Sequence, residues 1–169
     1  MQNNKITTLT KLARISNSYK NNNIKVGLIT GCFDVLHEGH IDLFRFAKKH
    51  VDILIVALDS DKAIKQGKGK DRPIHNISAR AKMLSELESV DYVLPIEEDY
   101  FFTQESVEPV YDKIHKLLMP HFLITTPKAD SYWKRKKERA EKYGAKMLLY
   151  KSQTNSSTSV IAKKISSQM

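Results

Sequence analysis

Short apolar segments alternate with amphipathic segments along this chain, and that alternation constrains the fold more than any other feature. The apolar segments, which predict strands, lie at 24–31, 51–58, 91–96, 121–126 and 145–150. The amphipathic segments, which predict helices, lie at 39–50, 77–89, 106–119, 130–143 and 156–165. Strands that are apolar throughout and separated by helices are typical of a parallel sheet covered on both faces. We therefore expect an α/β fold that binds its ligand at the carboxyl ends of the strands.

Length and composition limit the class of protein further. With 169 residues, the chain is long enough for one domain and short for two, so we treat 1–169 as a single domain. Cys32 is the only cysteine, and a lone thiol without a disulfide partner fits a reducing compartment. No apolar block has the length of a signal peptide or approaches the roughly 18 residues of a membrane span. We expect a cytoplasmic protein without membrane insertion.

The charge balance points to anionic partners. Lys and Arg total 28 against 19 Asp and Glu, which gives a net charge of +9. Such a balance favours nucleic acid, anionic lipid or a phosphorylated small molecule, and charge alone does not choose among them. Basic residues interleaved with aromatic ones, as nucleic-acid binding would favour, are missing, and no recognition motif is visible.

The stretch ITGCFDVLHEGHIDLF at 29–44 lies where the first predicted strand gives way to a helix. A helix start offers free N–H groups and a positive dipole end to an anion, and Gly31 and Gly39 let a ligand approach the backbone. His37 and His40 are three residues apart, so they share one helix face and can reach the same phosphate. Two other interpretations stay open. A zinc site would need another spacing and a third ligand, and the two rings could simply complete the packing of the helix start.

The segment GCFDVLHEGH resembles the signature of the HxGH nucleotidyltransferases, also called the cytidylyltransferase-like family. Four further segments are similar to the adenylyltransferase domain of ADP-heptose synthases, namely KITTLTKLARI (5–15), VALDSD (56–61), KGKDRPIHNISAR (68–80) and ESVDYVLPIEED (88–99). NSSTSVIAKKI (155–165) resembles the closing motif of that group and of glycerol-3-phosphate cytidylyltransferases. The resemblance implies a Rossmann-like, doubly wound five-stranded parallel sheet with helices on both faces. It also implies that a phosphate oxygen of an acceptor attacks the α-phosphate of a nucleoside triphosphate and releases pyrophosphate.

The catalytic candidates are His37, His40, Lys68 and Lys70. The two imidazoles would donate hydrogen bonds to phosphate oxygens that gain charge, since histidine can donate in either protonation state near pH 7. Lys68 and Lys70 belong, with Arg72, to a Gly-rich segment that we expect to be a mobile loop. Composition alone favours a solvated surface loop, whereas the resemblance implies that the loop folds over the phosphates and orders when triphosphate binds.

The nucleotide-binding candidates come from four parts of the chain. The backbone after the first strand would line the nucleotide pocket, and Asp34 would hold either the turn or a divalent ion. Arg80, in the first turn of its helix, opposes the helix dipole and so faces either a ligand or a salt bridge. The hydroxyl residues at 157–159 are helix caps, phosphate ligands or both, and Lys151 stands where the glycerol-phosphate relatives carry Arg. The set is Gly31, Cys32, Phe33, Asp34, Gly39, Arg72, Arg80, Lys151, Ser157, Thr158 and Ser159.

The expected partners follow from this resemblance. We favour ATP with a phosphorylated sugar as acceptor, and the alternative is CTP with glycerol 3-phosphate or another small phosphorylated acceptor. Mg²⁺ would arrive with the triphosphate, so we expect no metal site of the protein's own. The segment TTPKADSYW (125–133) departs from the family pattern where the base or acceptor is read, and Tyr132 and Trp133 there could stack on a ligand or serve packing. A non-catalytic nucleotide sensor, a nucleic-acid-binding protein and a homodimer stay open.

Overall fold

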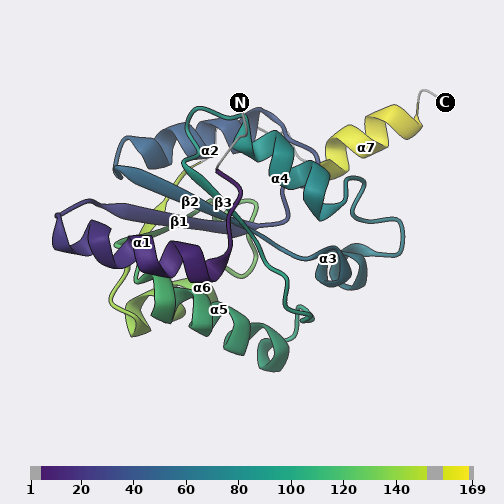
Figure 1. The fold of residues 1–169 in the computed structure, drawn as a ribbon. Helices are drawn as coiled ribbons and strands as arrows, with labels where there is room; N and C mark the ends of the chain where they lie inside the picture. Colours follow the sequence, from purple (N-terminus) through teal and green to yellow (C-terminus); the bar gives the residue numbers. More distant parts are fainter. Residues whose placement is uncertain (1–4, 152–157, 168–169) are drawn as a thin grey trace.

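The computed structural model describes residues 5–151 and 158–167, and its centre is one sheet of five parallel strands (Figure 1). The strands are β1 (Val26–Gly31), β2 (Ile53–Leu58), β3 (Tyr92–Pro95), β4 (Phe122–Thr125) and β5 (Lys146–Leu149). They lie in the order β3-β2-β1-β4-β5, so β1 pairs with β2 on one side and β4 on the other. The winding reverses between β1 and β4, and open α/β sheets bind ligands at such a switch point.

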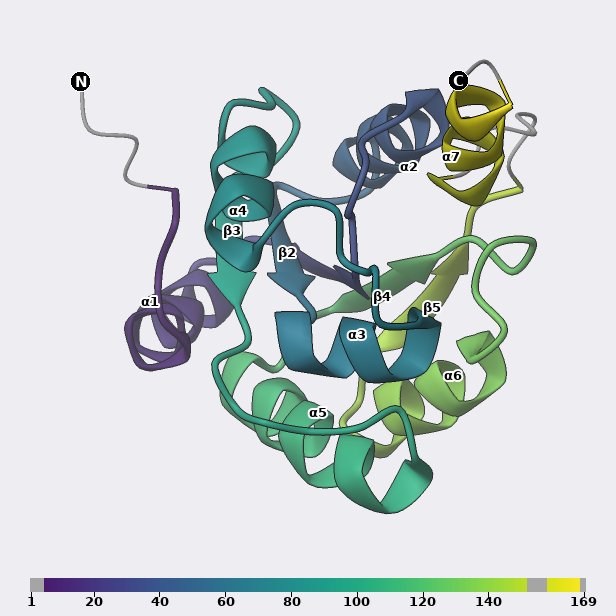
Figure 2. The ribbon, with the colours of Figure 1, turned by 90° about the vertical axis from the view of Figure 1, so that its right-hand side faces the viewer.

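Helices cover both faces of this sheet. In the described part of the chain they are α1 (Leu9–Asn21), α2 (Glu38–Lys48), α3 (Asp61–Lys68), α4 (Ile77–Ser85), α5 (Gln104–Leu118), α6 (Trp133–Lys142) and α7 (Thr158–Ser166). α2, α4 and α7 lie on one face, and α1, α3, α5 and α6 lie on the other (Figure 2). The expected doubly wound fold is confirmed. None of the described helices is both long and apolar enough to cross a membrane.

The apolar strands are explained by two separate cores, one on each face. Leu28 of β1 belongs to the core beneath α1, α5 and α6, while its neighbour Ile29 belongs to the core beneath α2 and α4. β2 divides in the same way, with Ile55 in the first core and Leu54 in the second. Because successive side chains point to opposite faces, a central strand buried on both sides must be apolar at every position.

The predicted strands are all present, and the predicted helices at 39–50, 77–89, 106–119 and 130–143 are present with shifted ends. The start of the helix expected at 156–165 lies partly outside the described residues. Two helices escaped prediction because their apolar stripes are narrow. α1 buries only Leu12 and Ser16, and α3 buries only Ala63 and Ile64. The expected Gly-rich loop is therefore wrong at its start, since residues 65–68 form the last turn of α3.

His115 of α5 is an ionisable side chain that is buried beneath the surface of the protein. It is fully buried, and neither ring nitrogen has a hydrogen-bond partner within the residues the structure describes. Burial, followed by the nearby Arg139 cation, lowers the pKa of the His115 ring to about 4, against the opposing effect of Asp112 and Glu108. The ring is therefore neutral at pH 7 and must gain a proton at a cost to folding if the pH falls.

We expect His115 to make the fold sensitive to acid. Between pH 6.5 and pH 4 the His115 ring is protonated in the unfolded chain but stays neutral in the folded chain. The free energy of unfolding therefore decreases as the pH is lowered from 6.5 to 4, by on the order of 3 kcal/mol. His115→Leu should remove this part of the pH dependence in urea unfolding curves recorded at pH 7 and pH 4.5. His50→Leu, at the exposed end of α2, is the control. An identical pH dependence in wild type and His115→Leu would contradict this account.

Candidate active site

The start of α2 brings the two predicted histidines together at the carboxyl end of β1. His37 is the extended N-cap residue of α2, and His40 follows within its first turn. The two imidazoles stack with ring centroids 3.7 Å apart and an interplanar angle of 27°. The buried Phe33 ring packs against His40 in an edge-to-face arrangement, with ring centroids 5.0 Å apart, and so supports the imidazole. The prediction that both rings share one face at the helix start is confirmed.

Both imidazoles are neutral in the absence of a ligand. Burial, followed by the neighbouring His37 and Lys68, lowers the pKa of His40 to about 3. The pKa of His37 is also lowered, chiefly by burial. The Nδ1 atom of each ring is buried without a hydrogen-bond partner among the described residues. Because buried polar atoms are nearly always satisfied, this pair fits a ligand site better than a purely structural role.

A cavity of about 410 Å³ opens beside the histidines at the switch point of the sheet. Its wall runs from the start of α2, across the ends of β1 and β4, to α5 and α6 on the opposite face. The cations on the wall are Lys68, Lys128, Arg135, Lys136 and Arg139. Predicted site residues on the same wall are Gly31, Cys32, Phe33, Asp34, His37, Gly39, His40, Lys68 and Thr158. A site of this size with several cations suits an anionic small molecule.

Lys68 reaches the site from the last residue of α3. Its ammonium lies close enough to affect the pKa of both the His40 ring and the Cys32 thiol, lowering each. The pKa of Cys32 is nevertheless raised to about 12, first by burial and then by the Asp59 carboxylate, so the thiol stays protonated. Lys68 is thus beside the histidines even without a phosphate to attract it.

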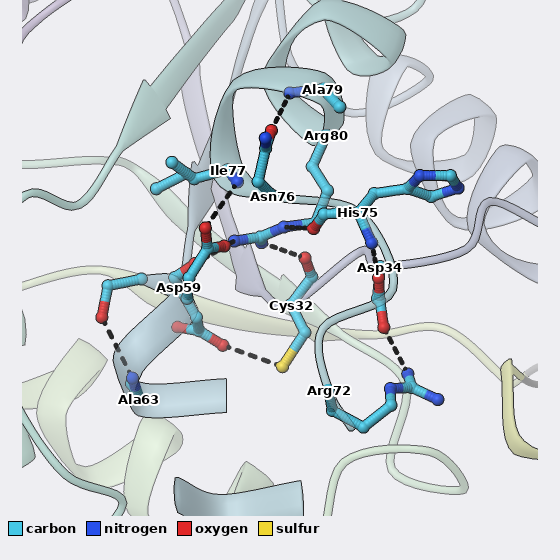
Figure 3. Close-up of polar contacts among 12 residues, drawn as sticks. Cys32, Asp34, Asp59, Ala63, Arg72, His75, Asn76, Ile77, Ala79 and Arg80 are labelled. Atoms are coloured by element: carbon cyan, nitrogen blue, oxygen red, sulfur yellow. Dashed lines mark hydrogen bonds and ion pairs between the residues drawn. The ribbon is translucent and has the colours of Figure 1, made fainter. Parts of the chain in front are cut away.

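Asp34 holds the segment between α3 and α4 in place. Its buried carboxylate accepts a hydrogen bond from the backbone N–H group of Ile74 at 3.0 Å. It also accepts one from the backbone N–H group of His75 at 2.9 Å and pairs with Arg72 at 2.7 Å (Figure 3). Of the two roles expected for Asp34, the structure supports holding the turn, because these donors occupy both carboxylate oxygens. Arg72 is therefore committed to an ion pair rather than presented to the cavity.

Arg80, expected among the nucleotide-binding residues, is bonded within the protein instead. Its side chain is fully buried, and the guanidinium donates to the backbone oxygens of Cys32, Asp59 and His75 and to the Asp61 carboxylate (Figure 3). Arg80 does not lie on the cavity wall. The position of Arg80 in the first turn of its helix, where a cation opposes the helix dipole, suggested either a ligand or a salt bridge. The structure shows a salt bridge, with Asp61 at 2.7 Å.

The remaining candidates are only partly brought together. Lys70 and Lys151 are exposed and do not lie on the cavity wall. Thr158 opens α7 on the wall, and its hydroxyl donates to the backbone oxygen of Val35 at 3.3 Å. Ser157 and the side chain of Ser159 lie outside what the structure describes.

Asp59 is a cavity residue that the sequence analysis missed. It follows β2 directly and is almost completely buried, yet its carboxylate accepts hydrogen bonds from the hydroxyls of Tyr100, at 2.7 Å, and Tyr111. The Cys32 thiol donates to its other oxygen at 3.3 Å. Burial and the adjacent carboxylate raise the pKa of both phenols, so the tyrosines remain donors. The signal was its place just after a strand of a parallel sheet, where polar residues gather.

The unusual segment after β4 forms another part of the wall. Asp130 pairs with Lys136 at 2.7 Å and accepts from the Thr125 hydroxyl at 2.7 Å. Lys136 also donates to the backbone oxygen of Thr30 at the end of β1. This network ties the segment to β1 and β4, and it places Tyr132 on the wall with 46% of its surface exposed.

Comparison with known proteins fits this site. A sequence profile described as cytidylyltransferase-like matches residues 28–168, a range that contains both histidines and the whole cavity wall. The chain therefore belongs to the cytidylyltransferase-like family and is a nucleotidyltransferase by class.

Two curated relatives and two solved structures are representative. The chain is 38% identical over 122 residues to the bifunctional protein HldE of Aliarcobacter butzleri, covering 72% of this chain and 24% of that protein. It is 43% identical over 94 residues to the bifunctional protein HldE of Haemophilus ducreyi, covering 56% of this chain and 20% of that protein. The chain thus spans no more than about a quarter of these relatives.

The solved structures show the fold. The lipopolysaccharide core biosynthesis protein of Thermoplasma volcanium has a TM-score of 0.61 at 22% identity, covering 78% of this chain and 99% of that chain. Pantoate-beta-alanine ligase of Francisella tularensis has a TM-score of 0.62 at 16% identity, covering 89% of this chain and 67% of that chain.

We expect the two active-site histidines to stay neutral until an anion binds. In NMR titrations of the free protein, the His40 ring should show no protonation between pH 8 and pH 5, because its pKa is lowered to about 3. A bound triphosphate stabilises the charged form and should move that titration to higher pH. A His40 signal that titrates near pH 6.5 in the free protein would contradict the assignment.

We expect Arg80 to act through the stability of the strand ends and not through direct contact with the nucleotide. Arg80→Met leaves three backbone oxygens and the Asp61 carboxylate without their donor, which should cost about 3 kcal/mol or more of unfolding free energy. Lys82→Met, on the exposed side of the same helix, is the matched control. Urea unfolding and a nucleotide titration would separate the two effects. Unchanged stability with weakened nucleotide binding would restore the original assignment.

Proposed function

We propose that this chain transfers a nucleoside monophosphate, with AMP favoured, from a nucleoside triphosphate to a phosphorylated sugar or polyol. The observation that carries the proposal is the stacked, neutral pair of His37 and His40 beside a cation-lined cavity at the switch point. The free N–H groups at the start of α2 add an anion site at the same place. A triphosphate is the ligand class that uses all of these groups together.

The reaction is an in-line displacement at phosphorus. A phosphate oxygen of the acceptor forms a bond to the α-phosphorus while the bond to the bridging oxygen of the β-phosphate breaks, and pyrophosphate carries away the bonding electrons. His37 and His40 donate hydrogen bonds to the oxygens that gain charge, and Lys68 adds its positive charge beside them. No protein nucleophile is required, and the buried Cys32 thiol, with its pKa raised to about 12, is unsuited to be one.

We propose that Mg²⁺ binds through the triphosphate rather than through the protein. The described residues contain no group of three or more His, Cys, Asp or Glu side chains that could hold a metal ion. Asp34, an acid within the GCFDVLHEGH segment, already holds Arg72 and two backbone donors. An ion bound by phosphate oxygens and water supplies charge neutralisation and needs few protein ligands.

Similarity to the HldE proteins supports ATP and a sugar phosphate as substrates. The match to the Aliarcobacter butzleri protein extends over 122 residues of this 169-residue chain, so it includes the central helices α3 and α4 beside the site. The segment at 125–133, where the base or acceptor is read, differs from the family pattern. CTP with a small phosphorylated acceptor is therefore the alternative, because small changes in a pocket can shift discrimination by a few kcal/mol.

We expect pyrophosphate release to require both a phosphorylated acceptor and His40. ATP, CTP, GTP and UTP would each be paired with heptose 1-phosphate and glycerol 3-phosphate. His40→Ala should lower turnover on the order of 10²–10³-fold while changing KM for the nucleotide less, because the imidazole acts on charge that develops in the transition state.

His50→Ala is the control for this experiment because His50 is exposed in the turn that follows α2, at the end away from the motif. Near-normal turnover of His40→Ala would contradict the site. Strong turnover with CTP and none with ATP would instead favour the cytidylyltransferase alternative and leave the histidine roles intact.

A further inference from the structure

Two aromatic side chains from different segments lie next to each other on the cavity wall. Phe102 comes from the connection between β3 and α5, and Tyr132 comes from the segment before α6. Their rings are nearly parallel, at 15°, with centroids 6.5 Å apart. Both rings lie on the wall, and Tyr132 is 46% exposed, so the pair is open to a ligand.

The position of Phe102 is fixed from two sides. Gly67 in the last turn of α3 leaves room for the ring, since a Cβ there would lie 2.3 Å from Phe102 Cδ2. Tyr100, two residues earlier, is buried and donates its hydroxyl to Asp59 at 2.7 Å. The same segment is thus held at the carboxyl end of β2, next to the reaction site. These contacts hold Phe102 in place before any substrate arrives.

The direction of attack places the acceptor on this side of the cavity. In an in-line displacement, the attacking oxygen approaches opposite the departing pyrophosphate. Under the proposed function, the triphosphate lies against the starts of α2 and α7, which share one face of the sheet (Figure 2). The acceptor then enters from the side of α3 and α5, where Phe102 forms the wall.

We propose that Phe102 and Tyr132 bind the ring face of a cyclic sugar phosphate and so favour ring-shaped acceptors over acyclic ones. This inference rests on the proposed function and names the acceptor class. An aromatic face suits the C–H groups of a sugar ring. Thr103 and Gln104 follow Phe102 on the wall, and Ser131 precedes Tyr132, so hydroxyl and amide groups flank the pair for the sugar hydroxyls.

Phe102→Ala and Gly67→Ala test the inference by two routes. The first removes a ring, and the second displaces it with a Cβ while improving the helix propensity of α3, so loss of folding does not explain its effect. Both should weaken binding of heptose 1-phosphate about tenfold and leave ATP and glycerol 3-phosphate binding unchanged. Phe101→Ala, which removes an exposed neighbouring ring away from the wall, should change none of these.

Binding can be measured apart from turnover. Trp133 is the only tryptophan and adjoins Tyr132, so its fluorescence should report sugar phosphate binding in wild type and variants. Equal affinity of wild type and Phe102→Ala for heptose 1-phosphate would overturn the inference, and so would a loss confined to ATP, which would place the base on the pair. Absence of pyrophosphate release with every substrate pair would contradict the proposed function, while the fluorescence titration would still decide whether the pair binds ring sugars.

Discussion

The buried guanidinium of Arg80 is the interaction on which the geometry of the site depends. It donates to the backbone oxygens of Cys32 after β1 and Asp59 after β2, and it pairs with Asp61 at the start of α3. One side chain of α4 therefore joins two neighbouring strand ends to the next helix (Figure 3). Removing a buried charge of this kind leaves several polar groups unsatisfied, so the whole carboxyl edge relies on it.

With that edge fixed, the polar residues around the cavity fall into two groups. Asp34 and Asp59 accept hydrogen bonds from the protein itself. The donors to Asp34 are backbone N–H groups, and the donors to Asp59 are tyrosine hydroxyls. His37 and His40 have buried nitrogens that the described residues leave without partners, and both are neutral. The two aspartates stabilise the shape of the cavity, and the two histidines are free to bind an anion. This division explains why a strongly basic chain can keep carboxylates so close to a phosphate site.

The sequence alone could predict the strands, the parallel sheet and the histidine pair, because each depends on local patterns. Continuous apolar runs require burial on both faces, and the spacing of His37 and His40 places them on one helix face. Contacts between distant segments could not be predicted. From its place in its own helix, Arg80 could have bound either a ligand or a carboxylate. Only the fold shows that it pairs with Asp61. Phe102 and Tyr132 gain their positions from two connections whose paths no local pattern specifies, whereas the place of Asp59 directly after β2 was a signal that the sequence did contain.

The central claim is that the histidine pair at the start of α2 binds the α-phosphate of a triphosphate. A crystal structure of the protein with a non-hydrolysable nucleoside triphosphate would test it directly. The account predicts that α-phosphate oxygens lie within hydrogen-bond distance of the His37 and His40 rings, with the pyrophosphate portion toward α2 and α7. A triphosphate whose α-phosphate lies away from both imidazoles would contradict it.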